Sequence, residues 1–449
     1  MSDNLFDGFP EVSEKQWKQK LQYELNGASY SDIMLTHSSD DIIVKPFYHL
    51  DSYKQIPHSN KEIIYNICQA VFIDQSNIAN KIALTAITNG ADSILFKASK
   101  PFDINAVLKN IKNDIQLHFE LQFLSENFIS DLQQQTRNYR TFLNIDIIGN
   151  LCKNGNWYHS LQKDINIFTR LHVRSSPSAN FSGVHAALYQ NAGATIVQQV
   201  AFALAHANEY LNFNSDVLNL NVQFSIGSNY FFEIAKLRAF RYLWKLITDD
   251  AKVKSDLHII ATPSNRNKTL YDFNTNLVRT TSECMSAIAG GADTICNISH
   301  DSIFRKRNET GERLARNQNL ILKYESNFNT SNQAVNGSYY IEALTKEIST
   351  KSLELFKDIE KNGGFLNQLT QGTIQKRIRD AAQKEQQLFD LKKITLTGIN
   401  KHQNSNDVIK GKIEIYPFMK TDPRKTLIQP IIPKRLAEKL EQQRLKNET

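Results

Sequence analysis

The sequence predicts an α/β protein built on a closed (β/α)8 barrel, or TIM barrel, with an N-terminal arm before it and helices after it. From about residue 64, short runs rich in β-forming residues alternate with helical segments. Strands that alternate with helices pair in parallel through right-handed crossovers, and eight repeats over about 250 residues are typical of this barrel. A doubly wound open sheet uses the same alternation and is the structural alternative.

Each predicted element follows from the pattern of side chains. The eight predicted strands lie at 64–73, 93–98, 117–123, 141–148, 181–188, 221–227, 257–264 and 294–299. Helical patterns lie between them, at 104–115, 194–211 and 230–247. Residues 165–176 could also form a strand, but Ile165, Phe168 and Leu171 have helical spacing, so we interpret them as the end of a helix.

The N-terminal arm, residues 1–60, is too short to form a core. Ser13 and Gln16 have the spacing of a capping box and predict a short amphipathic helix. The run at 41–50 is extended and ends in aromatic residues. We expect the arm to pack either on a partner or on the chain's own barrel. The candidate contact residues are Phe9, Trp17, Pro46, Phe47 and Tyr48.

The sequence divides further into a barrel at 61–330, a helical extension at 331–400 and a polar tail at 401–449. The extension contains two helical patterns, at 339–364 and 377–392. We expect the tail, which is interrupted by prolines, to end in an exposed charged helix or a frayed end.

Composition excludes several functions. The net charge is +7, but basic and acidic residues are mixed along the chain, so we expect no nucleic-acid binding. No apolar stretch reaches the ~18 residues of a membrane span, and the N-terminus shows no signal peptide, so we expect a cytoplasmic protein. The cysteines have no metal-ligand spacing, and we expect buried thiols and no metal site. They are Cys68, Cys152, Cys284 and Cys296.

Motifs of catalysis are mostly absent from the sequence. It contains no phosphate-binding loop, no G-x-G-x-x-G and no H-E-x-x-H. His300 and Asp301, with Arg305 close by, are the one acid–base pair at a strand end, and we interpret them as a solvated loop. The stretch FSGVHAALYQNAGAT (181–195) carries His185 in a setting typical of a catalytic acid at a barrel mouth.

Several long stretches occur together in one order. They are AGAT (192–195), LVRTTSECMSAIAGGADTI (277–295), GERLARNQNLILKYES (311–326) and NGSYYIEALT (336–345). With them the chain resembles the methylmalonyl-CoA mutase family, the adenosylcobalamin-dependent acyl-CoA mutases. The stretch FPEVSEKQWKQKLQYELNG (9–27) resembles the opening of that family's small, or beta, subunit.

Departures from the family pattern bear on activity. Catalytic members carry a tyrosine-bearing segment of the type IRQYAGFS, where this chain reads IYNICQAVFID (64–74). Their Q-T-S-G stretch is replaced by TPSNRNKTL (262–270). The family's cobalamin-binding domain of Rossmann type supplies a cobalt ligand from D-x-H-x-x-G, and that motif is absent from this sequence.

The resemblance also bears on whether His185 is catalytic. In the family the catalytic histidine stands in SGYHMQEAGAT, and counting back from AGAT without gaps puts Leu188 at that position. The likeness of His185 then comes from a shifted register, so we expect no catalytic residue in this chain.

The resemblance therefore implies a non-catalytic small subunit. It would form a heterodimer with a catalytic large (alpha) subunit, which would hold the acyl-CoA and adenosylcobalamin and interconvert methylmalonyl-CoA and succinyl-CoA. The alternative is an active mutase subunit that uses cobalamin held by a separate protein.

Overall fold

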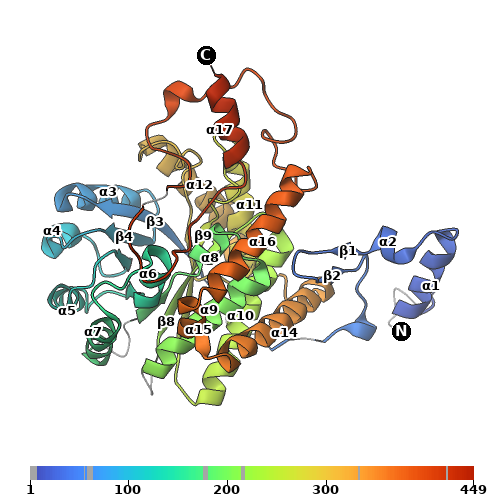
Figure 1. Ribbon diagram of the computed structural model, residues 1–449, viewed down its shortest axis with the longest axis horizontal. Coiled ribbons are helices and arrows are strands. Elements are labelled where there is room, and N and C mark those ends of the chain that lie inside the picture. The colour runs from blue at the N-terminus through green and yellow to red at the C-terminus, as the bar shows by residue number, and fades with distance from the viewer. Residues whose placement is uncertain are drawn as a thin grey trace, which may run out of the picture.

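The structure is a closed parallel barrel of eight strands with extensions at both ends (Figure 1). It is a computed structural model and describes residues 8–54, 56–57, 64–174, 180–213, 218–331, 334–420 and 423–448. The strands follow one another around the barrel in the order β10-β3-β4-β5-β6-β7-β8-β9. Their bounds are β3 Asn66–Ile73, β4 Ser93–Ala98, β5 Gln116–Leu121, β6 Thr141–Ile145, β7 Asn180–Val184, β8 Leu220–Ile226, β9 Leu257–Pro263 and β10 Thr294–Cys296. All eight predicted strands are present, and β10 closes the barrel on β3, which excludes the open sheet.

Helices follow the strands and cover the outside of the barrel. They are α3 Ser76–Thr88, α4 Ile104–Leu108, α5 Glu126–Gln135, α6 Ile147–Asn154, α7 Leu161–Arg174, α8 Ala187–Asn191, α9 Ile196–Phe213, α10 Tyr230–Ala251, α11 Thr275–Ala289 and α12 Glu309–Tyr324. The helical interpretation of 165–176 is confirmed up to the end of α7. Helix α4 is shorter than predicted, because Lys109 leaves the helical conformation and Asn110 is left-handed, with φ 62°.

The helical extension packs on the barrel. It consists of α13 Phe328–Ser331, α14 Tyr339–Lys361, α15 Gly364–Thr370 and α16 Thr373–Asp390. Helix α14 lies against α9 and α10, where Ile348 and Ile359 are buried in the main core.

The tail ends in a charged helix, as the sequence predicts, but a few of its residues are buried against the barrel. A short 3-10 helix, Lys410–Lys412, and the final helix α17, Glu438–Asn447, belong to it. Ile409, Phe418 and Leu436 are buried with Leu270 and Phe304, which lie in loops after β9 and β10. The sequence did not predict this packing, because these apolar residues are far apart in the sequence and have no regular period.

One stretch of the tail, residues 427–436, crosses the loops at the carboxyl ends of three strands, and we call it the strap. Gly155 and Cys152, after β6, accept backbone hydrogen bonds from Leu427 (2.9 Å) and Ile431 (2.8 Å). Asn191, after β7, accepts one from Lys434 at 2.9 Å. Arg266, after β9, accepts one from Leu436 at 2.9 Å. The strap therefore fixes the tail to the mouth of the barrel.

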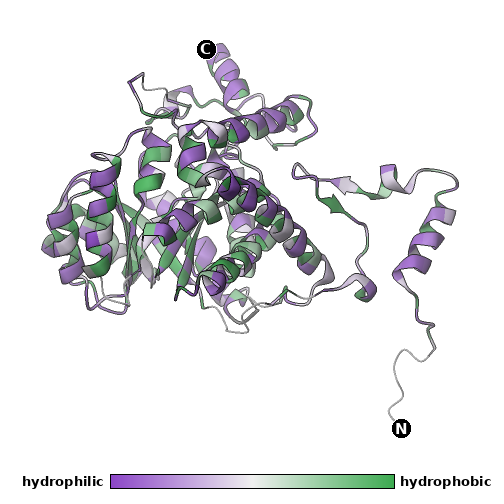
Figure 2. Ribbon diagram, turned by 60° about the horizontal axis from the view of Figure 1, so that its bottom comes forward, coloured by the Kyte–Doolittle hydropathy of each residue, from purple (hydrophilic) through white to green (hydrophobic). Residues whose placement is uncertain are grey.

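The arm extends away from the barrel in both views (Figures 1 and 2). It contains α1 Glu14–Glu24, α2 Tyr30–Met34, the antiparallel pair β1 Thr36–His37 and β2 Ile43–Val44, and a 3-10 helix, Leu50–Ser52. The predicted capping box of Ser13 and Gln16 is confirmed. Ile42 is buried in the main core, and Asp40 accepts a hydrogen bond from the Val197 N–H at 3.2 Å, so residues 40–42 anchor the arm. Among the described residues, no helix is long and apolar enough to cross a membrane.

Candidate functional site at the barrel mouth

Aromatic rings fill the axis of the barrel near the amino ends of its strands. His118 on β5, Phe142 on β6 and His258 on β9 form a ring stack, with centroids 4.4 Å (His118–Phe142), 4.1 Å (Phe142–His258) and 5.4 Å (His118–His258) apart. Strands β5 and β9 are opposite each other in the closed barrel, so the rings meet across its axis. All three side chains are buried.

Both histidines of the ring stack are neutral. Burial lowers the pKa of His118 well below its usual value, and the charges of His258 and Arg140 add to the effect. Burial also lowers the pKa of His258 to about 4, although Asp293 opposes the shift. His258 Nε2 lies 2.9 Å from the Thr294 hydroxyl. The ring stack thus behaves as a packed core.

A polar layer lies beside the rings inside the barrel. Asn144 on β6 is hydrogen-bonded to Asn221 on β8. The backbone of Asn144 is left-handed, with φ 50°, and the register of β6 with β7 shifts there. A Cβ atom at Gly183 on β7 would lie 2.7 Å from the Asn144 Cα, so a glycine is required at that close approach.

Charged groups gather at the carboxyl ends of the strands, where such barrels build their sites. Lys97 on β4 and Glu120 on β5 form an ion pair of 2.8 Å. Burial alone would raise the pKa of Glu120, but Lys97 and then His185 outweigh it and lower that pKa to about 2. Phe72 on β3 is 52% exposed, so solvent reaches this end of the barrel.

His185 and Leu188, the two positions compared with the family's catalytic histidine, lie in different parts of the structure. His185 directly follows β7 at the mouth, where its N–H donates to Asp146 at 2.8 Å and its Nε2 is buried without a hydrogen-bond partner. Leu188 lies one turn further, in the short helix α8, and is buried in the main core. The offset of three positions between them falls at the start of α8. His185 therefore lies at the mouth of the barrel. The assignment of Leu188 to the catalytic position stays a prediction.

A buried network stands behind His185. Asp146 caps α6 by accepting from the Gly149 N–H at 2.6 Å, and it also accepts from Tyr210 at 2.7 Å. His206 Nε2 lies 2.9 Å from Asp146, and His206 Nδ1 lies 2.8 Å from the Tyr189 hydroxyl. Burial opposes ionisation of Asp146, but His206 and these donors hold its pKa below the usual range. Because the network is fully buried, we assign it a positioning role. Local sequence patterns did not indicate this network, because its members are far apart along the chain.

His300 and Asp301 do not form the solvated loop that the sequence predicts. Both are buried, and Asp301 accepts from the Asn308 amide at 3.0 Å and from the Ser299 hydroxyl. His300 lies under the ring of Phe273, with centroids 5.6 Å apart. The tail contacts the same loop a few residues further on, where the Phe304 carbonyl accepts from the Glu414 N–H at 2.8 Å. The carboxylate of Asp301 therefore holds the loop together through its hydrogen bonds with Asn308 and Ser299 and does not form an acid–base pair with His300.

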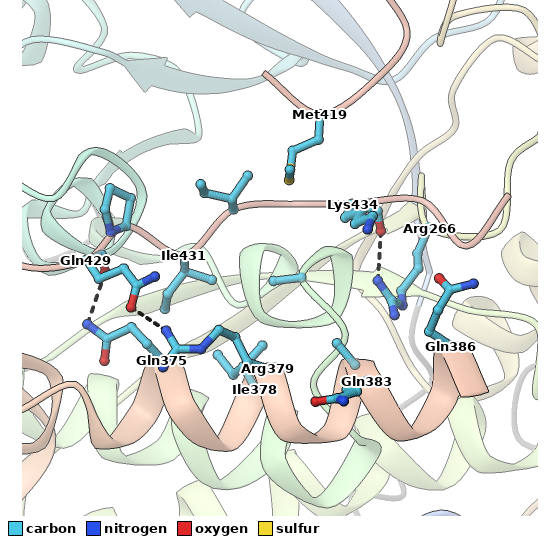
Figure 3. A pocket seen from close by; sticks show the side chains of 14 residues that line it. Arg266, Gln375, Ile378, Arg379, Gln383, Gln386, Met419, Gln429, Ile431 and Lys434 are labelled. Atoms are coloured by element: carbon cyan, nitrogen blue, oxygen red, sulfur yellow. Dashed lines mark hydrogen bonds between the residues drawn. The ribbon is translucent and has the colours of Figure 1, made fainter. Parts of the chain in front are cut away.

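A hollow of about 400 Å³ lies between α16 and the strap (Figure 3). Its floor is apolar, with Ile378 and Ile431 among its lining residues. The guanidinium of Arg266, at the edge of the hollow, binds groups of its own chain. It donates to Glu385 at 2.6 Å and to the Lys434 carbonyl at 2.7 Å. Arg379 is bonded to Gln429 across the hollow. The hollow holds the strap on α16 and brings together no acid–base pair.

The five predicted contact residues of the arm are only partly brought together. Trp17 stacks on Phe47 with centroids 4.4 Å apart, and both are half-buried. Tyr48 lies against Tyr340 of the chain's own α14, at 5.1 Å. Phe9 is 75% exposed and Pro46 is exposed.

These features define a (β/α)8-barrel protein whose mouth is charged and whose axis is filled by its own side chains. The chain belongs to the methylmalonyl-CoA mutase family, whose model matches residues 128–444. The match includes the second half of the barrel, the helical extension and most of the tail.

The curated relatives agree with this family. The chain is 29% identical to the methylmalonyl-CoA mutase small subunit of Porphyromonas gingivalis, over 92% of this chain and 73% of that protein. It is 33% identical to the methylmalonyl-CoA mutase of Rhizobium meliloti, over 54% of this chain and 36% of that protein. It is 31% identical to that of Escherichia coli, over 51% of this chain and 34% of that protein. The chain thus spans about three-quarters of the small subunit and about a third of the other two mutases.

Proposed function

We propose that this chain is the non-catalytic small subunit of a methylmalonyl-CoA mutase. In this role it supports a catalytic large subunit, which interconverts methylmalonyl-CoA and succinyl-CoA. The similarity to the Porphyromonas gingivalis small subunit over 92% of the chain supports the assignment.

The ring stack is the observation that carries the non-catalytic role. A barrel that works on a long thioester substrate needs free space along its axis or at its mouth. Here His118, Phe142 and His258 meet across the axis, and the polar layer of Asn144 and Asn221 beside them is buried as well. Removing a ring from such a packed interior costs several kcal/mol, so the axis is not a space that a substrate opens by binding.

The residues at the mouth do not fit adenosylcobalamin, and we propose that the large subunit holds it. The strap is hydrogen-bonded to the loops after β6, β7 and β9, where a flat cofactor above the barrel would lie. His185, the histidine of the mouth, is recessed, because its Nε2 is buried.

We propose that the arm contacts the large subunit. Its outer part, residues 8–35, buries none of its side chains. It also exposes several large apolar side chains, Phe9, Val12, Tyr23 and Ile33. Apolar side chains gathered on a thin projecting segment are typical of a surface that another protein covers.

Co-expression with the large subunit tests this proposal, and the structure improves the choice of deletion. Deleting residues 1–50 would also remove Asp40 and Ile42, which anchor the arm to α9 and the core. Deleting residues 1–35 removes only the outer arm. We expect the shorter deletion to abolish co-purification while the chain stays folded. An unchanged yield of complex would show that the arm is not the contact.

The alternative, an active subunit that takes cobalamin from a separate protein, is favoured by one observation. His185 lies at the mouth beside the Lys97–Glu120 pair, as a catalytic histidine would. The two functions are separated by His185→Ala in the assembled complex. A non-catalytic chain keeps the turnover of the complex, whereas an active one loses a large part of it.

Localisation in the cytoplasm is also a proposal. Its support is that all four cysteines are free and buried, as expected of a protein in a reducing compartment. Peptide mapping of the purified protein under non-reducing conditions would check the state of these thiols.

A further inference from the structure

Two cysteines meet at the seam where the barrel closes. Cys68 on β3 and Cys296 on β10 are direct partners in the parallel ladder that joins the last strand to the first. Both side chains point into the barrel and pack in one small cluster with Leu95 and Ile260. Neighbouring strands lie about 4.8 Å apart, which falls within the Cα–Cα range of disulfides, about 4.4–6.8 Å.

The two thiols lie in the same cluster and are not equivalent. The Cys68 thiol, and after it the Lys97 ammonium group, hold the pKa of Cys296 below its usual value, although burial opposes the shift. Burial raises the pKa of Cys68 well above its usual value. Cys296 is therefore the better nucleophile, and Cys68 is the thiol placed to attack it.

Lys97 connects the pair of thiols with the mouth of the barrel. Its side chain is 38% exposed and interacts electrostatically with both sulfurs. Cys152 on α6 and Cys284 on α11 provide internal comparisons, because both are buried outside the barrel and burial raises the pKa of each.

We propose that Cys68 and Cys296 form a redox-active dithiol, a modification site at which a peroxide links β3 to β10 by a reversible disulfide. The Cys296 thiolate attacks one peroxide oxygen, the O–O bond breaks, and the departing hydroxide takes up the proton that Cys296 released. The sulfur is left as a sulfenic acid. The Cys68 sulfur then attacks the Cys296 sulfur, the S–O bond breaks, and hydroxide leaves with the Cys68 proton. Two thiols and one peroxide thus give one disulfide and two waters.

Peptide mapping of the folded, full-length chain after treatment with hydrogen peroxide tests the proposal. We expect a peptide pair joined through Cys68 and Cys296, lighter by two hydrogen atoms and separated again by dithiothreitol. We expect Cys152 and Cys284 to remain thiols in the same sample. Absence of the joined pair, or equally fast oxidation of Cys152 and Cys284, would overturn the proposal.

Two serine variants test the separate roles of the sulfurs. Cys68→Ser leaves Cys296 without its partner, so its sulfenic acid should accumulate and react with dimedone. Cys296→Ser should leave Cys68 unlabelled under the same conditions. Equal labelling in the two variants would overturn the assigned order of attack. If either variant fails to fold, the peptide map of the peroxide-treated chain without substitutions is the deciding test.

Discussion

The barrel interior buries its large apolar side chains, whereas the arm leaves several of its own exposed. In the barrel, Phe142 and its two histidine neighbours are buried across the axis. In the arm, Phe9 and Tyr23 are 75% and 85% exposed. Burial of apolar surface is favourable by roughly 25 cal/mol per Å². Covering the exposed side chains of the arm would therefore be favourable, whereas the rings in the barrel are already buried. The difference is what we expect of a chain that binds a partner through its arm, as proposed above.

The same substitution in the two regions should give the largest contrast. We expect Phe142→Ala to lower the free energy of unfolding by about 3–5 kcal/mol, because it leaves a cavity beneath His118 and His258. Phe9→Ala removes a side chain that this chain does not bury, and should change it by less than about 0.5 kcal/mol. Urea unfolding of both variants measures the difference. Equal effects would mean that the barrel axis is not packed as described.

Deleting residues 1–35 should have the next largest effect, on binding. We expect the dissociation constant for the large subunit to rise at least about 100-fold, equivalent to about 2.7 kcal/mol, because aromatic contacts such as Trp17 dominate interfaces. Titration calorimetry or biolayer interferometry with the purified large subunit checks this. A dissociation constant that does not change would place the interface elsewhere on the barrel.

Acid should weaken the barrel through His258. Its folded pKa of about 4 lies below the ordinary value, so the unfolded chain binds a proton at a pH where the folded chain does not. The stabilisation is complete above about pH 6.5 and is lost as the pH falls toward 4, which amounts to about 2 kcal/mol by pH 5. Unfolding experiments at pH 7 and pH 5 measure the loss. His258→Phe should reduce it, and an equal loss in the variant would exclude His258 as its source.

The smallest expected effect is that of the outer arm on stability. Residues 8–35 contact the rest of the chain through few groups, such as the stack of Trp17 on Phe47 and the Glu14–Lys45 pair. We expect their deletion to change the free energy of unfolding by less than about 1 kcal/mol, since exposed pairs contribute little. A thermal unfolding scan checks this. A much larger loss would show that the arm belongs to the core of its own chain.

Much of the barrel could be predicted from the sequence, because local patterns specify it. Buried parallel strands are continuous apolar runs, and 93–98 and 294–299 were visible in that way between helical periods. The tail could not be predicted, because Ile409, Phe418 and Leu436 meet only after the chain folds back over the barrel. Their spacing carries no period, so the segment looked polar.

The site was less predictable than the fold. The sequence indicated His185 as a candidate at the barrel mouth, and the structure brings its N–H within 2.8 Å of the Asp146 carboxylate. The ring stack was missed because its members come from β5, β6 and β9, which are far apart in sequence and meet only across the closed barrel. A histidine in the middle of a buried strand was the available signal, and by itself it predicts nothing about the opposite wall.

The central claim, that this chain supports catalysis without performing it, is tested most directly by turnover of methylmalonyl-CoA with adenosylcobalamin. The assay compares the chain alone with the complex that it forms with the large subunit. We predict no turnover and no stoichiometric corrin absorbance for the chain alone, and turnover with bound corrin for the complex. Turnover by the isolated chain, or corrin that co-purifies with it at stoichiometric level, would contradict the account.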